Sequence, residues 1–572
     1  MPLATSPASN THPLHWAALL LAVAAFPLLW SLLASVSAGL NAQAWAELAA
    51  QAPTVPALWI STYTGVAATA LAWAGSALLL ALCFPSGPWA RLLRPLPAML
   101  ALPHAAFAVG FVMLMAPTGW LMRLGVALLA PLNGLLGLPL DTPPPWPTTQ
   151  DPWGMGLIAV LALKEMPFLL WAAAAQLQQP DLAQRLAQEL QVAQSLGYPP
   201  RSAWWRVAWP QLVGRLQAPL LAVLVYNLTV VDVALIAGPT TPPTLSVLAS
   251  QWLQDAHPTH NAMGAAAAWA LAGLAVFLAA AAAMVQRGAR RWNAARQTRG
   301  VAPPVVPPSH RSPWSLPQTF DWGSIAMTSL LPTAYGAVAL ALALGSVIGV
   351  WPFPDLGPQD WTWQAWQAVA DSAAMVGATV ALGLGSAGAA LLWTVAWLEC
   401  APPHWQRRAQ SLWYLPLVVP VVLWALGLHR LTLAWGLHAS PAGIWLAHTL
   451  CVLPYVMLSL HGAYGGFDAR LQSMAASLGR SRWAFVWQVK WPLLRAALCA
   501  SFAVGFAVSV AQYLPTLYVG AGRFPTVTTE AVALASGGAR SLLAAFAALL
   551  WLLPAIVFGL AALSGRPRTL GP

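Results

Sequence analysis

The residues of this chain that could do chemistry are ionisable side chains inside long apolar segments. Lys164 and Glu165 are adjacent in "LALKEMPFLLW", Asp232 lies in "VVDVALIAG", and His104 follows a proline in "LPHAAFAVG". Asp371 stands early in another apolar segment. Each such group costs about 2.5–3.5 kcal/mol at the centre of a membrane helix, so it usually serves a function. These five residues are the candidates for a polar path through a membrane.

Each candidate has a structural alternative. Lys164 and Glu165 could be a satisfied pair within one helix, although the side chains of adjacent residues point about 100° apart and so toward different neighbours. Asp371 could be a charge at the membrane interface. His448, which also lies in an apolar segment, is more readily a satisfied core histidine than part of a path.

No sequence pattern typical of catalysis or nucleotide binding is present. A P-loop needs a lysine followed by Ser or Thr after spaced glycines, but the two lysines of the chain, Lys164 and Lys490, precede Glu165 and Trp491. The HExxH and GxSxG patterns are absent, and the four cysteines form no CxxC pair. We therefore expect a protein that is not an enzyme and that binds no metal or cofactor itself.

The composition predicts an all-α integral membrane protein. Of 572 residues, 59% are hydrophobic and 7% are charged, whereas soluble domains carry about 25% charged residues. Barrel strands are excluded because the apolar runs are far longer than the roughly ten residues of such a strand. The runs predict about twelve transmembrane helices, near residues 14–38, 57–82, 97–116, 154–178, 214–238, 262–286, 325–350, 366–398, 411–428, 441–463, 495–518 and 541–563.

The net charge of +11 reflects membrane topology. Most arginines fall on one side of the predicted spans, and by the positive-inside rule that side is the cytoplasm, together with both termini. Juxtamembrane arginines indicate contact with anionic membrane lipid, so we expect no nucleic-acid partner. The Arg- and Pro-rich stretch 287–320 is predicted to be an extended cytoplasmic linker between two halves, 1–286 and 321–572.

Two cytoplasmic loops, 181–212 (the first loop) and 464–494 (the second loop), repeat one another. At an offset of 282 residues, nine of 22 positions between 191–212 and 473–494 are identical. The identical pairs are Ala193/Ala475, Ser195/Ser477, Leu196/Leu478, Gly197/Gly479, Trp205/Trp487, Val207/Val489, Trp209/Trp491, Pro210/Pro492 and Leu212/Leu494.

The pattern of each loop predicts a helix, a sharp turn, a short helix and then a span. In the first loop, residues 181–196 show a helical apolar stripe, and Gly197 and Gly479 suit a left-handed helix cap. Pro210 and Pro492 fit the first turn of the next span. An amphipathic hairpin lying in the membrane interface is the structural alternative. Recurrence in both halves favours a docking surface for a partner with two equivalent sites, and aromatic residues with arginine are typical of such surfaces.

The two loops resemble the EAA loop of ABC-importer permeases. The segments "LAHTLCVLPYVMLSL" (446–460) and "YLPLVVPVVLWALGL" (414–428) resemble core spans of that family. The segments "LPHAAFAVGFVMLMAPTGW" and "LALKEMPFLLW" resemble those of YnjC-type fused permeases, which are related to fused thiamine and iron(III) permeases.

This resemblance implies two tandem six-helix MetI-like permease domains in the bacterial inner membrane. It further implies import of a small solute by alternating access, two copies of a separate ABC ATPase that binds ATP and Mg²⁺, and a periplasmic solute-binding protein. The implied ATPase-coupling residues are Gln191, Ala193, Leu196, Gly197, Arg201, Trp205, Arg206, Val207, Pro210, Ser473, Ala475, Leu478, Gly479, Arg482, Trp487, Val489 and Pro492. Gln191 and Ser473 depart from the family pattern, because they stand where the motif has glutamate.

Two other functional classes remain open. An ion-coupled secondary transporter also has internal repeats, although it does not need a repeated docking loop. A membrane-embedded enzyme is disfavoured because the outer loops carry only scattered acidic residues such as Asp141 and Glu530.

Overall fold

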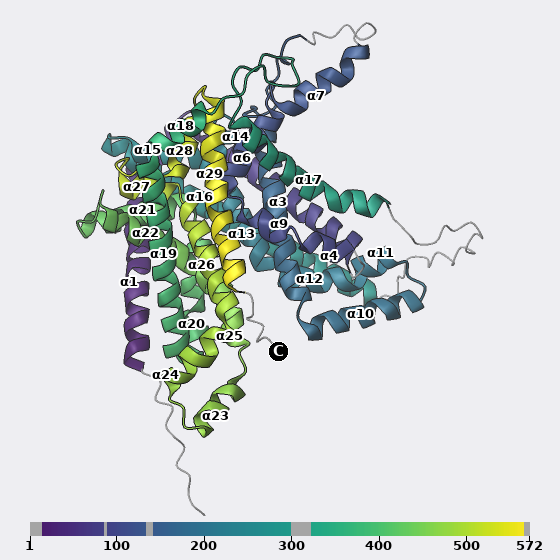
Figure 1. Cartoon of the computed structure of the whole chain (residues 1–572), viewed down its shortest axis with the longest axis vertical. Coiled ribbons are helices and arrows are strands. Elements are labelled where there is room, and N and C mark those ends of the chain that lie inside the picture. The colour runs from purple at the N-terminus through teal and green to yellow at the C-terminus, as the bar shows by residue number, and fades with distance from the viewer. Residues whose placement is uncertain (1–13, 85–87, 133–140, 299–321, 566–572) are drawn as a thin grey trace, which may run out of the picture.

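The chain forms two linked bundles of helices, which the computed structural model describes for residues 14–84, 88–132, 141–298 and 322–565 (Figure 1). The first half contains α1 (Leu14–Gly39), α2 (Ala42–Ala50), α3 (Thr54–Cys83), α4 (Pro88–Leu93), α5 (Leu96–Ala101), α6 (His104–Met115), α7 (Trp120–Leu129), α9 (Met155–Leu177), α10 (Pro180–Ser195), α11 (Pro200–Ala203), α12 (Trp209–Arg215), α13 (Gln217–Thr229), α14 (Asp232–Ala237), α15 (Leu245–Gln254) and α16 (Pro258–Thr298).

The second half contains α17 (Trp322–Gly345), α18 (Gln364–Asp371), α19 (Ala373–Cys400), α20 (Pro403–Trp413), α21 (Val421–Ala434), α22 (Pro441–Gly465), α23 (Ala469–Ser477), α24 (Arg482–Phe485), α25 (Trp491–Leu493), α26 (Arg495–Val510), α27 (Leu514–Gly520), α28 (Val527–Leu534) and α29 (Arg540–Ser564). Within the described ranges, the only β feature is a single bridge between Ile348 and Trp361.

The predicted class, an all-α membrane protein of about twelve spans, is confirmed. In the described part of the chain, nine helices are long and apolar enough to cross a membrane, or up to twelve if each of three bent pairs is one span. Helices are required because a backbone in lipid must satisfy its own hydrogen bonds.

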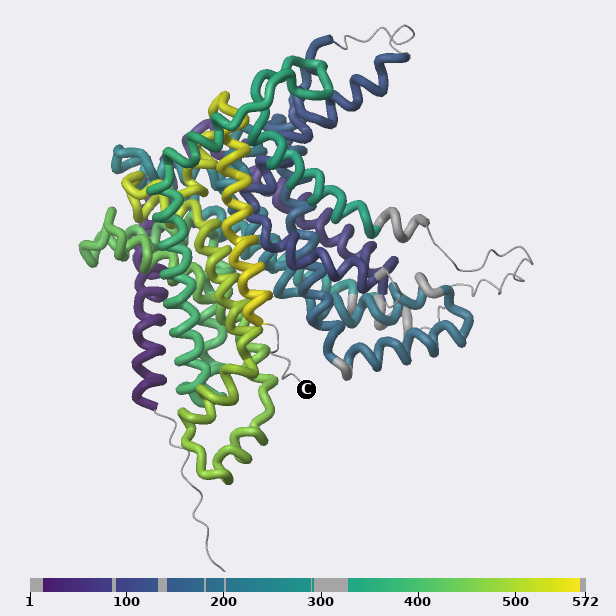
Figure 2. Tube along the Cα trace, viewed as in Figure 1, coloured from purple at the N-terminus to yellow at the C-terminus, as the bar shows by residue number. Residues whose placement is uncertain are grey.

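The two halves repeat one packing scheme. In the first half α3 packs against α9 and α13, and in the second half α19 packs against α22 and α26. The largest buried core joins the halves, since it contains Phe107 of α6, Leu342 of α17 and Phe546 of α29. Figure 2 shows the purple-to-teal first half beside the green-to-yellow second half, with the purple first helix, α1, lying against the second half.

The first helix of each half packs on the third long helix of the other half. Thus α1 lies against α21, and α17 lies against α6. A glycine stands at each crossing: a Cβ at Gly427 would overlap the backbone carbonyl of Ser31 in α1, and one at Gly110 would lie 2.7 Å from Cγ1 of Val338 in α17. Small residues at such crossings let membrane helices approach closely, so these contacts hold the halves together.

Several predicted span boundaries were wrong, and two of the predicted spans are broken at prolines. The span predicted at 97–116 is broken between α5 and α6 at Pro103. The span predicted at 411–428 is instead α20 with a short turn, followed at 102° by α21, which begins after Pro420. The residue before a proline avoids the helical region, which explains why these helices stop and restart there.

The structure also differs from the prediction at the start of the linker. Helix α16 continues through residue 298, so the first residues of the stretch 287–320 are helical and not extended. Alanine and arginine are frequent there, and both favour helices. Residues 299–321 lie outside the described residues.

The crossing of α1 and α21 leaves no room for a side chain at Gly427, which yields a prediction. Gly427→Ala should lower the stability of the purified chain in detergent by about 1–3 kcal/mol, the usual cost of overpacking. The measurement is the thermal unfolding temperature. The matched control is Gly388→Ala in α19, where an added Cβ meets nothing within 4 Å and alanine favours the helix. Equal unfolding temperatures for the two variants would contradict the tight crossing.

Candidate functional site: two repeated loops and a polar cluster

The two repeated loops lie at the same end of the molecule, the lower end in Figure 1. In the first loop, α10 (Pro180–Ser195) carries the predicted apolar stripe, and Leu182, Leu186 and Leu190 are all buried. This face attaches α10 to the bundle and leaves its other face exposed. In the second loop the corresponding helix is the shorter α23 (Ala469–Ser477).

Both loops turn at the predicted glycine. Gly197 has φ +89° and Gly479 has φ +70°. The N–H of Gly197 donates to the carbonyl of Gln194, and the N–H of Tyr198 donates to the carbonyl of Ala193. The second loop repeats this pair of bonds one for one, from Gly479 and Arg480. This helix-ending motif needs a left-handed residue, which explains the glycines physically.

The short helix after each turn contains a π-helical segment at the same place. These segments are Trp204–Ala208 and Val486–Lys490. Trp209 N–H donates to Trp204, five residues back, and Trp491 N–H donates to Val486 in the same way. Pro210 and Pro492 directly follow these tryptophans. A proline lacks an N–H and repels the carbonyl four residues earlier, so it favours the wider π-helical turn.

The predicted position of these prolines was wrong. Pro210 and Pro492 belong to separate short helices, α12 and α25, and not to the first turn of a span. The spans α13 and α26 begin after bends of 64° and 73°. Each loop therefore ends in a helical arm that lies across the start of a span.

Two of the residues shared by the loops are exposed in both copies. Leu196 is 66% exposed and Leu478 is 78% exposed, while Trp205 and Trp487 are 42% and 62% exposed. The same leucine and the same tryptophan are thus exposed at equivalent places in the two repeats.

The other loop residues singled out from the sequence are placed as follows. Gln191, Arg206, Pro210, Ser473 and Pro492 are exposed, Ala193 is buried, and Ala475, Val207 and Val489 are half-buried. The guanidinium of Arg206 lies 5.4 Å from the centre of the Tyr198 ring. The side chain of Arg201 lies outside the described residues.

The second loop is held by an ion-pair network that the sequence analysis missed. Lys490 Nζ lies 2.7 Å from the carboxylate of Glu399 in α19, and Arg482 donates to the backbone carbonyl of Glu399. Lys490 also lies 4.5 Å from the centre of the Tyr464 ring. The sequence contains one signal that could have revealed this network: Glu399 is the only acidic residue between Asp371 and Asp468.

The first loop is held mainly by aromatic contacts. The Trp204 ring centre lies 5.7 Å from that of Phe84, and the Trp209 ring centre lies 4.9 Å from that of Trp73. Gln211 donates to the carboxylate of Glu189 at 2.6 Å, the one carboxylate contact seen among the described residues of this loop. The loops thus share a backbone geometry but are anchored by different chemistry.

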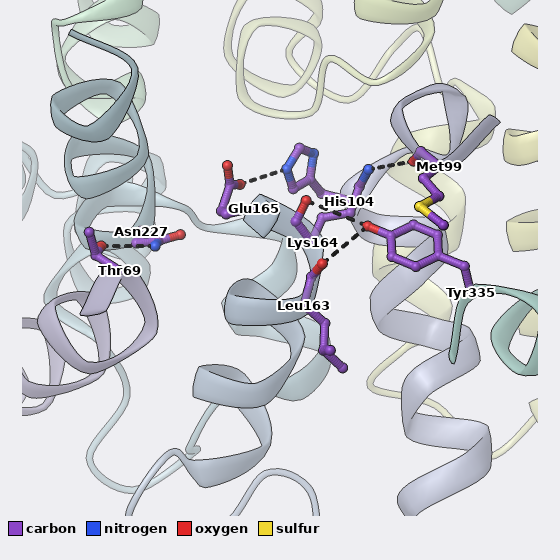
Figure 3. Close-up of polar contacts among 8 residues, drawn as sticks. All are labelled: Thr69, Met99, His104, Leu163, Lys164, Glu165, Asn227 and Tyr335. Atoms are coloured by element: carbon purple, nitrogen blue, oxygen red, sulfur yellow. Dashed lines mark hydrogen bonds and ion pairs between the residues drawn. The ribbon is translucent and has the colours of Figure 1, made fainter. Parts of the chain in front are cut away.

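The candidate path residues of α6 and α9 form two separate polar contacts, shown in Figure 3. Glu165 of α9 lies 2.9 Å from Nε2 of His104 in α6, and Glu165 is buried. Lys164 turns the other way: its Nζ donates to the carbonyl of Met99 at 3.0 Å and lies 5.7 Å from the centre of the Tyr335 ring. Of this adjacent pair, only Glu165 faces His104.

Asp232 belongs with His104 and Glu165, whereas Asp371 does not. Asp232 is half-buried at the start of α14, which packs against both α6 and α9, the helices that carry His104 and Glu165. Asp371 is exposed at the end of α18, and no contact in the described structure joins it to the other candidates.

His448 is a satisfied core residue. Its ring nitrogens lie 2.9 Å from Ser509 Oγ and 2.8 Å from Thr516 Oγ1. Among the residues that the structure describes, no group of three His, Cys, Asp or Glu is placed to hold a metal.

The chain is similar along almost its whole length to a known transporter subunit. It is 35% identical over 561 residues to the inner membrane ABC transporter permease protein YnjC of Escherichia coli K12, which covers 97% of this chain and 96% of that protein. No protein-family model matches the sequence.

Two shorter similarities point the same way. The molybdenum transport system permease protein ModB of Mycobacterium tuberculosis is 33% identical over 123 residues, or 19% of this chain and 47% of that protein. The spermidine/putrescine transport system permease protein PotC of Escherichia coli K12 is 21% identical over 158 residues, or 28% of this chain and 60% of that protein. Together with the repeated loops and the helical fold, these relationships show that the chain belongs to the inner-membrane permease subunits of ABC transporters.

Proposed function

We propose that this permease imports a small solute from the periplasm to the cytoplasm of a bacterium by alternating access, powered by a separate ATPase. The observation that carries the proposal is the pair of repeated loops, which expose the same leucine and tryptophan at one end of the molecule. One ATPase subunit would dock on each loop, so two copies would bind one chain. Those subunits would hold the ATP and Mg²⁺.

The loop geometry provides a route for the movement. ATP-driven closure of the two ATPase subunits would draw the short helices of the two loops together. Each short helix continues through a bend directly into α13 or α26, and these spans pack against α3 and α19. A displacement at the loops would therefore move each bundle as a body and open it at the opposite end, where a periplasmic solute-binding protein would deliver the solute.

The topology follows from the charge distribution. By the positive-inside rule, the arginine-rich loops, the linker and both termini lie in the cytoplasm. One observation supports this topology: α1 begins at the same end of the molecule as the two loops (Figure 1).

An ion-coupled secondary transporter is the alternative function. It would need the intramembrane carboxylates, but it would not need exposed apolar residues repeated on two loops. The names of the relatives refer to molybdenum and to spermidine and putrescine, so they do not select one solute for this chain.

The docking surface can be tested at its exposed leucines. We predict that the double variant Leu196→Asp and Leu478→Asp, purified from its native membrane, loses an ATP-binding subunit that accompanies the unaltered chain at about two copies per chain. The measurement is quantitative mass spectrometry of the co-purified proteins. Both leucines are more than half exposed, so the changes should cost little folding stability.

The matched control for this test is Leu356→Asp. Leu356 is 58% exposed and lies in the segment between α17 and α18, away from both loops. The control should keep the ATPase. An unaltered chain that carries no ATPase and still transports in ATP-depleted vesicles with an ion gradient would contradict the proposal and favour the secondary transporter.

Glu399 is predicted to position the second loop for coupling. Glu399→Gln removes the partner of Lys490, and the loss of a charge-assisted contact of this kind costs about 1.5–3 kcal/mol. We expect the ATPase to bind still, but transport-coupled ATP hydrolysis in reconstituted vesicles to fall by at least about tenfold, because each 1.4 kcal/mol is a factor of ten in rate.

Two further variants make this prediction specific. Glu189→Gln in the first loop should have a smaller effect, because glutamine can still accept the hydrogen bond from Gln211. Exchanging the charges, with Glu399→Lys and Lys490→Glu together, should restore part of the coupling. A coupled hydrolysis rate that is unchanged in Glu399→Gln would show that the ion pair does not position the loop.

A further inference from the structure

Two short helices occupy equivalent places at the end of the molecule opposite the two loops. Helix α14 follows the end of the span α13 and leads into α15, and α27 follows the end of α26 and leads into α28. The starts of α14 and α27, Asp232 and Leu514, are 282 residues apart, and so are those of α15 and α28, Leu245 and Val527. All four helices lie at the upper end in Figure 1, away from the loops at the lower end. The first unit, α14 with α15, is therefore repeated by the second unit, α27 with α28.

In the first half, the end of α14 is fixed by the segment that precedes α9. The N–H of Gln150 donates to the carbonyl of Ala237 at 3.2 Å, and its side-chain Nε2 donates to the carbonyl of Ile236 at 3.1 Å. Gln150 has φ +56°, a left-handed conformation that residues other than glycine seldom adopt. The next helix is anchored as well, because the N–H of Leu245 donates to Oγ of Ser61 in α3 at 2.7 Å. The first unit is thus held by its own half.

The second half repeats these bonds at the matching positions. The N–H of Ala439, which has φ +50°, donates to the carbonyl of Val519 at 2.9 Å. Nδ1 of His429 donates to the carbonyl of Tyr518 at 3.0 Å, in the role of the glutamine side chain. Both accepting carbonyls stand 282 residues after the acceptors of the first half. The first N–H of α28 donates to Oγ1 of Thr379 in α19 at 3.1 Å, so the second unit is also held by its own half.

The two units touch each other across the boundary between the halves. The hydroxyl of Tyr518 in α27 donates to the carbonyl of Ser250 in α15 at 3.0 Å, and these residues are 6% and 3% exposed. The reciprocal pair of helices, α14 and α28, also packs together. At the equivalent positions this pair has Ile236 and Val532, which are buried and whose side chains cannot form a hydrogen bond. Of these two equivalent pairs of residues, Tyr518 and Ser250 alone share a hydrogen bond.

Each unit is bonded more firmly to its own half than to the other unit. The hydrogen bonds described above number three for each unit within its half, whereas one hydroxyl joins the two units. Because a single hydrogen bond contributes little net free energy, the junction separates before either unit leaves its half. Figure 2 shows that the two bundles spread apart toward the end that carries the loops, while the junction joins them at this end. Drawing the loops together would therefore pull the junction apart.

We propose that the two units form the periplasmic gate of this permease and that the hydrogen bond between Tyr518 and Ser250 is its latch. Each unit moves as part of its own half, so rotation of the halves separates α15 from α27 and α14 from α28, and the gate opens. Gln150 and His429 are positioning residues, because each holds the end of a short helix against its own half. The gate rests on the proposed import function, which assigns this end of the chain to the periplasm.

The test measures the width of the junction in the complete complex. The four native cysteines are replaced by alanine, and spin labels are attached at Gln251→Cys in α15 and Ala533→Cys in α28, which are exposed and equivalent in the two units. The labelled chain, in lipid nanodiscs, is combined with its ATPase. We expect a non-hydrolysable ATP analogue to lengthen the distance between the two labels by several ångströms, because the gate opens as the loops approach each other.

The latch is tested by Tyr518→Phe, which removes the hydroxyl but keeps the ring. Without nucleotide, we expect the population with the long distance to rise about two- to tenfold, the range that the loss of one net hydrogen bond represents. The matched control is Tyr335→Phe. Tyr335 is also 6% exposed and its hydroxyl donates to the carbonyl of Leu163 at 3.3 Å, but this bond joins α17 to α9 and not the two units. The control should leave the distance distribution unchanged.

A label distance that stays fixed while the nucleotide draws the loops together would overturn the gate, and a distribution in Tyr518→Phe equal to that of the unaltered chain would overturn the latch. The nucleotide response needs no change at Tyr518, so the gate is tested even if that variant does not fold. If no ATPase binds the chain, the same distance is measured in vesicles under an ion gradient. Lengthening there would refute the ABC importer and leave the gate in place, and a fixed distance would refute both.

Discussion

Close contact between the first helix of each half and the opposite half is the constraint on which the rest of the structure depends. At Gly427 the backbones of α21 and α1 come together with no room for a side chain, and Gly110 provides the same approach between α6 and α17. Because each half holds the first helix of the other, the halves cannot separate as independent bodies. Movement between them has to be rotation or sliding about these two crossings, which is the kind of movement that alternating access needs.

The shape of the molecule repeats, but its chemistry does not. Both loops have the same glycine turn and π-helical segment, yet one is held by Trp204 and Trp209 and the other by the Glu399–Lys490 ion pair. Fusion in one chain fixes the pairing of the two halves, so each half can specialise without the risk of pairing with a copy of itself.

The sequence predicts those features that depend on local physics. Apolar length predicts the spans, and the spacing of Gly197 and Gly479 before their prolines predicts the turns that the structure contains. The sequence does not reveal contacts between distant residues. His104 and Glu165 are 61 positions apart, and Glu399 and Lys490 are 91 positions apart; their pairing depends on how helices pack. The breaks at Pro103 and Pro420 were missed because proline is also tolerated inside membrane helices, as Pro167 and Pro454 show.

The central claim is that nucleotide on the ATPase moves the two loops relative to one another. The most direct measurement is the distance between spin labels at Gln194→Cys and Ala476→Cys, which are exposed and equivalent in the two loops, in the purified complex with its ATPase. By this account, a non-hydrolysable ATP analogue shortens the distance by several ångströms, and removal of the nucleotide restores it. An unchanged distance distribution in a complex that still couples ATP hydrolysis to transport would contradict the account.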